Sequence, residues 1–173
     1  MRPDVGYCQG MSHIVGNLLL HCGPPQECFK VFCNMQTCSI INDFHSFNYT
    51  RIAGTYKVYW KLLLEHCPKM HAKLLESDLI SCSIFLLEWM ITLFSSTLEI
   101  SVAAYIWDQV FFFGEMHMMR VAIAISKIVE LKTMNGPDIA EVDAQRELKD
   151  CSKHVSKPEL VKMLMKMKSQ IKY

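Results

Sequence analysis

The sequence predicts an all-α fold, a compact multi-helix domain with short connections. Apolar residues recur at intervals of three and four along most of the chain, as they do on one face of a helix. The sequence shows no alternation typical of strands, no internal repeat of about 20–50 residues and no low-complexity tract. With 173 residues, of which 51% are hydrophobic, the chain is long enough for one domain with a sizeable core.

The first predicted helix has the clearest apolar stripe. Its stripe begins at Met11 and runs through Leu18 to Cys22, with His13 and His21 lying off it as expected surface histidines. Gly23-Pro24-Pro25 ends the helix. Because a turn-rich strip of residues 2–10 comes directly before this helix, burial of the helix would fix the direction in which the strip points.

Further stripes, each ended by a glycine, a proline or a polar break, predict the remaining helices of the compact part. Residues 42–49 interrupt this pattern and predict a loop anchored by three aromatic side chains. Trp89 is expected in the core. Asp108 is a lone carboxylate in apolar company, where we expect it to cap a backbone group or meet an arginine, since a buried unpaired charge is unfavourable. The ranges of these helices are 26–40, 51–66, 69–76, 84–94, 101–113 and 118–130.

The last part of the chain differs from the rest in charge. The whole chain carries a net charge of +1, which excludes strong general attraction to nucleic acid, but residues 149–173 hold seven lysines against Asp150 and Glu159. We therefore predict a compact region over residues 1–135, then a charged linker and a basic amphipathic helix over residues 136–173. This helix either docks on the core or meets an acidic partner or a membrane surface.

Cellular location is inferred from what the sequence lacks. No secretory leader follows Met1, and no Cys-x-x-Cys pair occurs among the eight cysteines, which we expect to be reduced and mostly buried, without a metal. The longest apolar run, residues 79–94, is interrupted by polar side chains and is too short for a membrane span. These features favour a cytoplasmic protein, and the high apolar content suggests a domain lacking a segment that would cover part of its surface.

The strip before the first helix carries the candidate chemistry. It reads Arg-Pro-Asp-Val-Gly-Tyr-Cys-Gln-Gly-Met over residues 2–11 and places Gln9 near Gly6 and Gly10. A glutamine amide can hold a water on one side and a phosphoryl oxygen on the other. Both glycines allow positive φ and close approach of another molecule. From the residues alone, a turn that merely caps the next helix would need the same glycines and is the favoured interpretation.

Three stretches in this order resemble TBC domains, which are GTPase-activating domains for Rab proteins. Residues 5–12 resemble the glutamine-finger motif Tyr-x-Gln-Gly. Residues 88–95 resemble the tryptophan helix of the family, and Ile106-Trp107-Asp108 followed by Gly114-Glu115 resembles its Trp-Asp helix. The resemblance covers about residues 2–130 and implies a wholly helical fold.

The resemblance implies a regulator of a small GTPase in vesicle trafficking rather than an enzyme with its own substrate. Gln9 would act as the catalytic glutamine finger that orients the hydrolytic water, with Asp4, Tyr7 and Gly10 binding the GTPase. Trp89, Trp107 and Asp108 would be structural. No cofactor is implied, because the GTP and magnesium belong to the partner Rab-family GTPase. Peripheral contact with endomembranes through the basic C-terminal helix is a further expectation.

One part of the family pattern has no match in this sequence. TBC domains carry a catalytic arginine in an Ile-x-x-Asp-x-x-Arg motif upstream of the glutamine, and the arginines here, Arg2, Arg51, Arg120 and Arg146, lie in no such motif. We therefore expect a domain truncated at its N-terminus. Two alternatives to GTPase activation stay open: a non-catalytic GTPase-binding module, and a helical scaffold that docks partners on exposed apolar surface.

Overall fold

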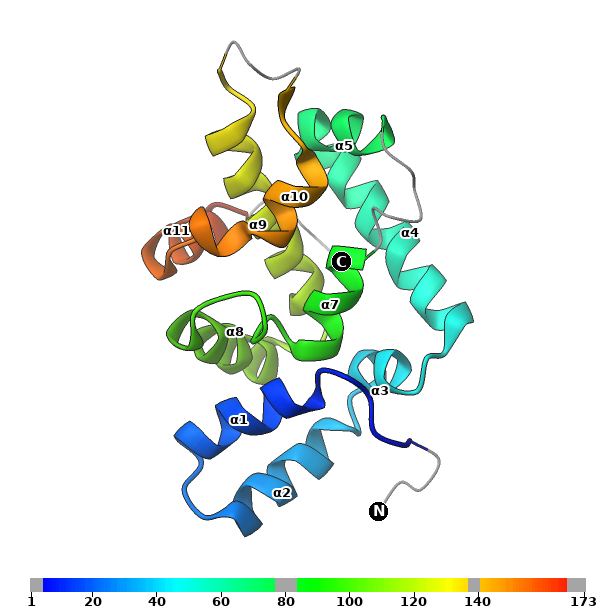
Figure 1. The fold of residues 1–173 in the computed structure, drawn as a ribbon, viewed down its shortest axis with the longest axis vertical. Coiled ribbons are helices and arrows are strands. Elements are labelled where there is room, and N and C mark those ends of the chain that lie inside the picture. The colour runs from blue at the N-terminus through cyan, green and yellow to red at the C-terminus, as the bar shows by residue number, and fades with distance from the viewer. Residues whose placement is uncertain (1–4, 77–83, 137–140, 168–173) are drawn as a thin grey trace.

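The computed structural model describes residues 5–76, 84–136 and 141–167, and over these ranges the chain is helical, with no strand. The prediction of an all-α fold is confirmed (Figure 1). No helix within these ranges is long and apolar enough to cross a membrane. The helices are α1 (Met11–His21), α2 (Pro25–Met35), α3 (Ser39–His45), α4 (Tyr49–His66), α5 (Pro68–Leu75), α7 (Ile84–Thr92), α8 (Ile100–Phe113), α9 (His117–Thr133), α10 (Ala144–Lys149) and α11 (Lys157–Met167), with a short 3₁₀ turn η2 (Cys151–Lys153).

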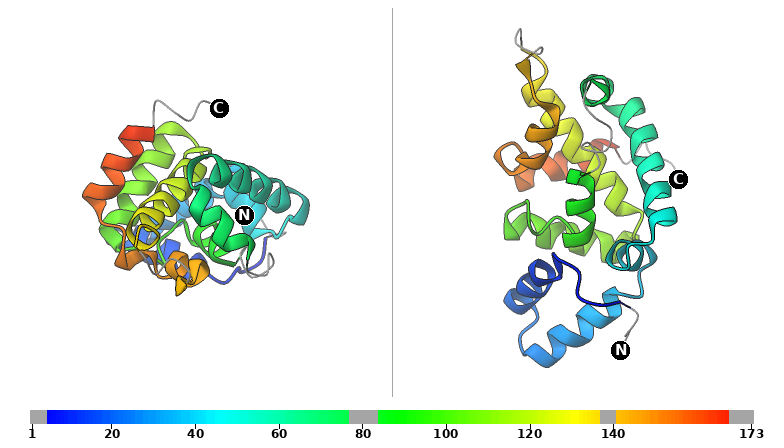
Figure 2. Two further views of the ribbon diagram at one scale, coloured as in Figure 1. Left: turned by 90° about the horizontal axis from the view of Figure 1, so that it is seen from above. Right: turned by 45° about the vertical axis from the view of Figure 1, so that its right-hand side comes forward.

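Helix α9 is the centre of the fold. It contacts α4, α5, α7, α8, α10 and α11, and most of its side chains are buried, including all five residues from Val121 to Ile125. A helix that other helices surround buries most of its surface, so most of its side chains must be apolar. Helices α1 and α2 form a pair at the opposite end of the molecule from α5 (Figures 1 and 2). This pair meets the rest of the fold mainly where α1 contacts α7.

The prediction for residues 26–49 is wrong in one respect. Helix α2 ends at Met35, and α3 covers the first half of the stretch that was predicted as a loop. Ile41 and Phe44 are fully buried, so α3 does have an apolar face. Its first turn is capped by the carboxylate of Glu115, which accepts hydrogen bonds from Ser39 Oγ at 2.5 Å and from the backbone N–H of Ile40 at 3.0 Å. This cap comes from a residue far along the chain, so the local pattern could not reveal it.

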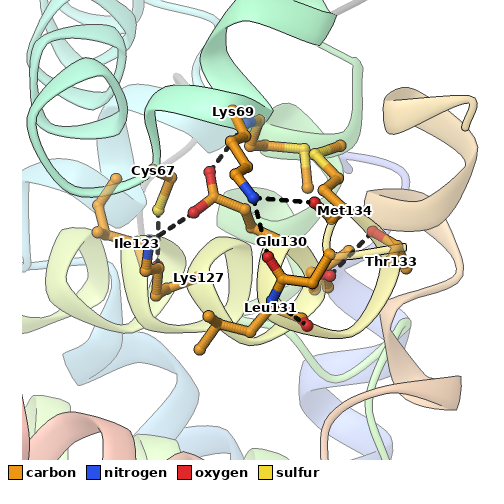
Figure 3. A network of polar contacts seen from close by, with 11 residues as sticks. Cys67, Lys69, Ile123, Lys127, Glu130, Leu131, Thr133 and Met134 are labelled. Atoms are coloured by element: carbon orange, nitrogen blue, oxygen red, sulfur yellow. Dashed lines mark hydrogen bonds and ion pairs between the residues drawn. The ribbon is translucent and has the colours of Figure 1, made fainter. Parts of the chain in front are cut away.

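A second carboxylate holds α5 against α9. Glu130 is 3% exposed, and its Oε2 accepts the backbone N–H of Met70, in the first turn of α5, at 2.8 Å. Its other oxygen pairs with Lys127 (Figure 3). Nearby, Lys69 Nζ donates to the carbonyl oxygen of Met134 at 3.2 Å, at the end of α9. Glu130 therefore caps one helix while belonging to another.

The C-terminal helix α11 packs on α9. Its stripe of Leu160, Leu164 and Met167 is buried, while Ile171 of the predicted stripe lies outside the described residues. Glu159 forms an ion pair with Lys132 of α9 at 2.6 Å, and the hydrogen bonds from Lys132 and Ser156 lower the pKa of Glu159 to about 2. The docking alternative is thus the one that the structure shows. The division of the chain at residue 135 stays a prediction.

Every cysteine of the described residues is a free thiol. Cys67 and Cys151 are completely buried, and burial raises the pKa of each thiol to about 12. Because the thiolate is the reactive form, alkylation of the folded protein with iodoacetamide at about pH 8 should leave both residues unmodified, whereas the half-buried Cys33 reacts. Peptide mass spectrometry before and after unfolding in urea measures this. Labelling of Cys67 in the folded state as fast as Cys33 would contradict the buried placement.

Candidate functional site

Residues 8–11 form a tight turn that leads into α1. The backbone N–H of Met11 donates to the carbonyl oxygen of Cys8 at 3.1 Å, and the N–H of His13 donates to that of Gly10 at 3.0 Å. Cys8 is 3% exposed and anchors the turn in the core. Gly10 has a φ of 111°, in the left-handed region that favours glycine at the third position of a turn. Gln9 therefore sits at the tip of a turn that is closed by hydrogen bonds and anchored on both sides.

Gly10 also packs directly against the end of α7. A methyl group built on its Cα would lie 2.6 Å from Cγ2 of Ile91 and 3.0 Å from Cγ2 of Thr92, which leaves no room for a side chain. Gly6 and Gly10 were both expected to allow positive φ and the close approach of another molecule. Only Gly10 has a positive φ. Gly6 has no neighbour within 4 Å of such a methyl group, and the close approach of a partner at Gly6 stays a prediction.

The side chain of Gln9 is exposed and faces open space. Among residues 5–76, 84–136 and 141–167, no hydrogen bond to its amide is found. It borders a shallow depression of about 460 Å³, which we call the Gln9 hollow. The hollow is lined by Gln9, Gly10, His13, Phe47, Ile84, Leu87, Glu88, Ile91, Thr92 and Ser96.

Three of the residues that line the Gln9 hollow, Glu88, Thr92 and Ser96, are joined by hydrogen bonds. Thr92 Oγ1 donates to the carbonyl oxygen of Glu88 at 2.8 Å, and Ser96 Oγ donates to the carboxylate of Glu88 at 3.1 Å. The described residues that line it include no arginine. Arg51 and Arg146 are exposed on α4 and α10, Arg120 lies on α9, and Arg2 lies outside the described residues. The described residues that line the hollow therefore offer a partner no arginine or lysine.

The other residues predicted to bind a GTPase lie along the same strip. Tyr7 is 77% exposed, and Asp4 lies outside the described residues. Tyr7 borders a second depression of about 310 Å³, between the strip and α2, whose lining includes Met11, Phe29 and Phe32. Tyr7 and Gln9 are therefore both exposed on the one strip, while Cys8 between them is buried.

Trp89 and Trp107, which were predicted to be structural, are both buried. Trp89 is 1% exposed and stacks edge-on with Phe85, their ring centroids 5.1 Å apart. Trp107 donates its indole N–H to the carbonyl oxygen of Leu93 at 2.9 Å. Leu93 and Phe94 both have positive φ, at 50° and 65°, a conformation that is unfavourable for residues with side chains. Trp107 thus helps to hold the strained turn that follows α7.

Asp108 does not occupy the apolar surroundings that the sequence predicted, because its side chain is exposed on α8. The carboxylate that does serve as a cap in this region is Glu115, at α3. The structure shows it just before α9, with its side chain directed to a different helix.

Sequence reasoning missed two buried polar residues behind the turn, His45 and Gln36. They are 3% and 8% exposed, and His45 contacts the carbonyl oxygen of Ile91. His45 fell in the predicted loop. Its spacing of four from the buried Ile41 is the signal that could have placed it on the inner face of a helix.

Comparison with known protein families shows to which family this chain belongs. The family model for the Rab-GTPase-TBC domain matches residues 1–134, which include the turn, the Gln9 hollow and helices α1 to α9. The chain belongs to this family, whose members are regulators of Rab GTPases.

Individual relatives are more distant. The chain is 31% identical over 129 residues to TBC1 domain family member 14 of Rattus norvegicus, covering 75% of this chain and 18% of that protein. It is 29% identical over 143 residues to growth hormone-regulated TBC protein 1 of Xenopus tropicalis, covering 81% of this chain and 41% of that protein. It is 24% identical over 142 residues to small G protein signaling modulator 3 of Rattus norvegicus, covering 82% of this chain and 19% of that protein. The chain thus spans less than half the length of these relatives.

Proposed function

We propose that this chain is the part of a GTPase-activating domain that presents a glutamine finger, Gln9, to a GTP-bound Rab protein. The observation that carries the proposal is an exposed amide, without a hydrogen bond in the described part of the chain, at the tip of a turn fixed by Gly10 and α7. Such an amide is free to bond a water and a phosphoryl oxygen at once. The neighbouring hollow would receive a segment of the GTPase.

In the proposed mechanism the protein contributes position rather than covalent chemistry. Phosphoryl transfer to water depends mainly on aligning the nucleophile and stabilising the charge on the transferred group. The side-chain oxygen of Gln9 would accept a hydrogen bond from the attacking water. The side-chain NH₂ group of Gln9 would donate a hydrogen bond to a phosphoryl oxygen. The fixed turn makes this orientation available before the GTPase arrives, so that little freedom is lost on binding. GTP and magnesium would be held by the GTPase.

The arginine expected beside the glutamine would have to come from outside the described residues. An arginine finger accelerates hydrolysis by roughly 10³–10⁵. The lack of an arginine among the described residues lining the Gln9 hollow therefore favours a second candidate function, a module that binds a GTP-bound Rab protein without accelerating hydrolysis. A cytoplasmic location is part of both proposals, since free cysteines are typical of a reducing compartment.

The test is a single-turnover assay with a panel of GTP-loaded Rab proteins, in which phosphate release is followed with and without the chain. Gln9→Ala should reduce any acceleration at least tenfold, equal to about 1.4 kcal/mol. Gln26→Ala is the matched control, because Gln26 is exposed on α2 and lines neither depression. Equal rates for the two variants would refute the finger role. Tight binding of the GTP-bound form without acceleration would identify the second function.

A further inference from the structure

His45 lies between two buried polar partners behind the Gln9 turn. Its Nε2 is 2.9 Å from the carbonyl oxygen of Ile91, and its Nδ1 is 3.0 Å from the side-chain amide of Gln36. His45 is the last residue of α3, Ile91 lies at the end of α7, and Gln36 directly follows α2. One imidazole therefore connects three segments that surround the base of α1.

The hydrogen-bond partners of His45 determine which of its ring nitrogens carries a hydrogen. A carbonyl oxygen can only accept, so Nε2 must carry a hydrogen and donate it to Ile91. Burial lowers the pKa of His45, which favours the neutral ring. In the neutral ring Nδ1 is an acceptor, but the Gln36 atom placed 3.0 Å from it is the carbonyl oxygen Oε1, while the amide nitrogen of Gln36 has no partner among the described residues. Turning this amide by 180° exchanges the two atoms and lets its NH₂ group donate to Nδ1, so we assign that orientation. Each atom of the ring that can form a hydrogen bond is then used.

The carbonyl of Ile91 is a group that a helix end leaves unpaired. Helix α7 stops at Thr92, and the last four carbonyl groups of a helix have no partner within it. After Thr92 the chain passes through the left-handed residues Leu93 and Phe94. His45 bonds the carbonyl before this turn, and Trp107 bonds the carbonyl of Leu93 within it. The two side chains together determine where the end of α7 lies.

The end of α7 in turn supports the Gln9 turn. The side chains of Ile91 and Thr92 are the nearest neighbours of Gly10 on the side where it lacks a Cβ, so even a small movement of Ile91 would meet the backbone of Gly10. Gly10 follows Gln9 directly. Contacts therefore lead from the His45 ring through Ile91 to Gly10, without a gap.

We propose that His45 is a positioning residue for Gln9, acting through the backbone and side chain of Ile91. The catalytic role of Gln9 in this inference rests on the proposed function. The role of His45 in holding the Gln9 turn rests only on the contacts described above. His45 touches neither the Gln9 hollow nor any group that would reach the nucleotide. Its contribution is to keep the Gln9 turn at one place and in one orientation.

The first experiment is kinetic. His45→Phe keeps an aromatic ring but removes both hydrogen bonds. It should lower kcat for the GTP hydrolysis by a Rab protein that this chain stimulates about tenfold, with little change in KM, since a displaced catalytic group impairs the chemical step more than binding. His45→Gln retains a donor near the position of Nε2 and should recover part of the loss. Adding His45→Phe to Gln9→Ala should cause no further loss.

The matched control is Tyr59→Phe. It also removes a buried hydrogen bond, of 2.8 Å between Tyr59 Oη and Ser126 Oγ, but it does so between α4 and α9, away from the turn. It should lower stability without lowering kcat. A fall in kcat as large as that of His45→Phe, or an additional loss in the Gln9→Ala background, would show that His45 acts only through general stability and would overturn the proposal.

The second experiment does not depend on GTPase activity. Hydrogen exchange of the Met11 and His13 amides, which close the turn by bonding Cys8 and Gly10, should be at least tenfold faster in His45→Phe than in Tyr59→Phe. Equal exchange in the two variants would overturn the proposal. If the wild-type chain accelerates no Rab protein, the proposed function fails, while faster exchange would still support the role of His45 in ordering the turn.

Discussion

Gly10→Ala should lower the free energy of unfolding by about 2–4 kcal/mol. The backbone at Gly10 is left-handed, a conformation that costs about 1–2 kcal/mol for a residue with a Cβ. In addition, the new methyl group would overlap Ile91 Cγ2 at 2.6 Å, and overpacking a tight contact typically costs about 1–3 kcal/mol. Ile91 cannot give way easily, because this methyl group is attached directly to its Cβ. Urea denaturation followed by circular dichroism measures the change.

Gly16→Ala provides the matched control, with an effect of opposite sign. Gly16 lies within α1, has no positive φ, and has no neighbour within 4 Å of an added methyl group. Alanine is favoured over glycine inside a helix by about 0.8–1 kcal/mol, so this variant should be slightly more stable than the wild type. Equal stability of the Gly10→Ala and Gly16→Ala proteins would contradict the close contact between Gly10 and α7.

Glu130→Leu should destabilise the fold by about 2–4 kcal/mol. The substitution removes the acceptor for the backbone N–H of Met70, and a buried donor without a partner costs about 1–3 kcal/mol. It also leaves Lys127 without its carboxylate. The cost of this loss is moderated because the Lys127 side chain is 28% exposed and can turn toward water. Chemical denaturation gives the size of the effect.

Two further substitutions separate the roles of Glu130. Glu130→Gln keeps an oxygen that can accept from Met70, so it should be less destabilising than Glu130→Leu. Lys127→Met keeps the acceptor for Met70 but leaves the buried Glu130 carboxylate without its counter-ion, so it tests the ion pair and the buried charge together. If Glu130→Gln proved as harmful as Glu130→Leu, the ion pair rather than the helix cap would be the main contribution of Glu130, contrary to our expectation.

The part of the fold that could be predicted from the sequence is the part fixed by local periodicity. The apolar stripes of α1 and α9 are complete over several turns, so both helices were placed within a few residues of their ends. Helix α3 was missed because it is short, carries polar residues on its inner face, and is capped by Glu115 from far along the chain. Periodicity contains no information about a cap that is supplied by another helix.

The candidate site could be predicted only in part for a similar reason. The motif around Gln9 gave the residue, and the positive φ of Gly10 follows from its place in a turn. The difference between Gly6 and Gly10 depends on the position of Ile91, which is a tertiary fact. His45 could not be assigned a role either, because its two partners are nine and forty-six residues away in the sequence.

The two caps that cross between helices have a consequence for folding kinetics. Isolated helices shorter than about 12–15 residues are marginal in water, and α3 and α5 have only 7 and 8 residues. Each is completed by a carboxylate from the segment that begins just before α9, Glu115 for α3 and Glu130 for α5. During synthesis on the ribosome, neither helix can acquire its cap until that later segment has left the exit tunnel. Helices α3 and α5 should therefore become stable only once α9 is present and fold together with it.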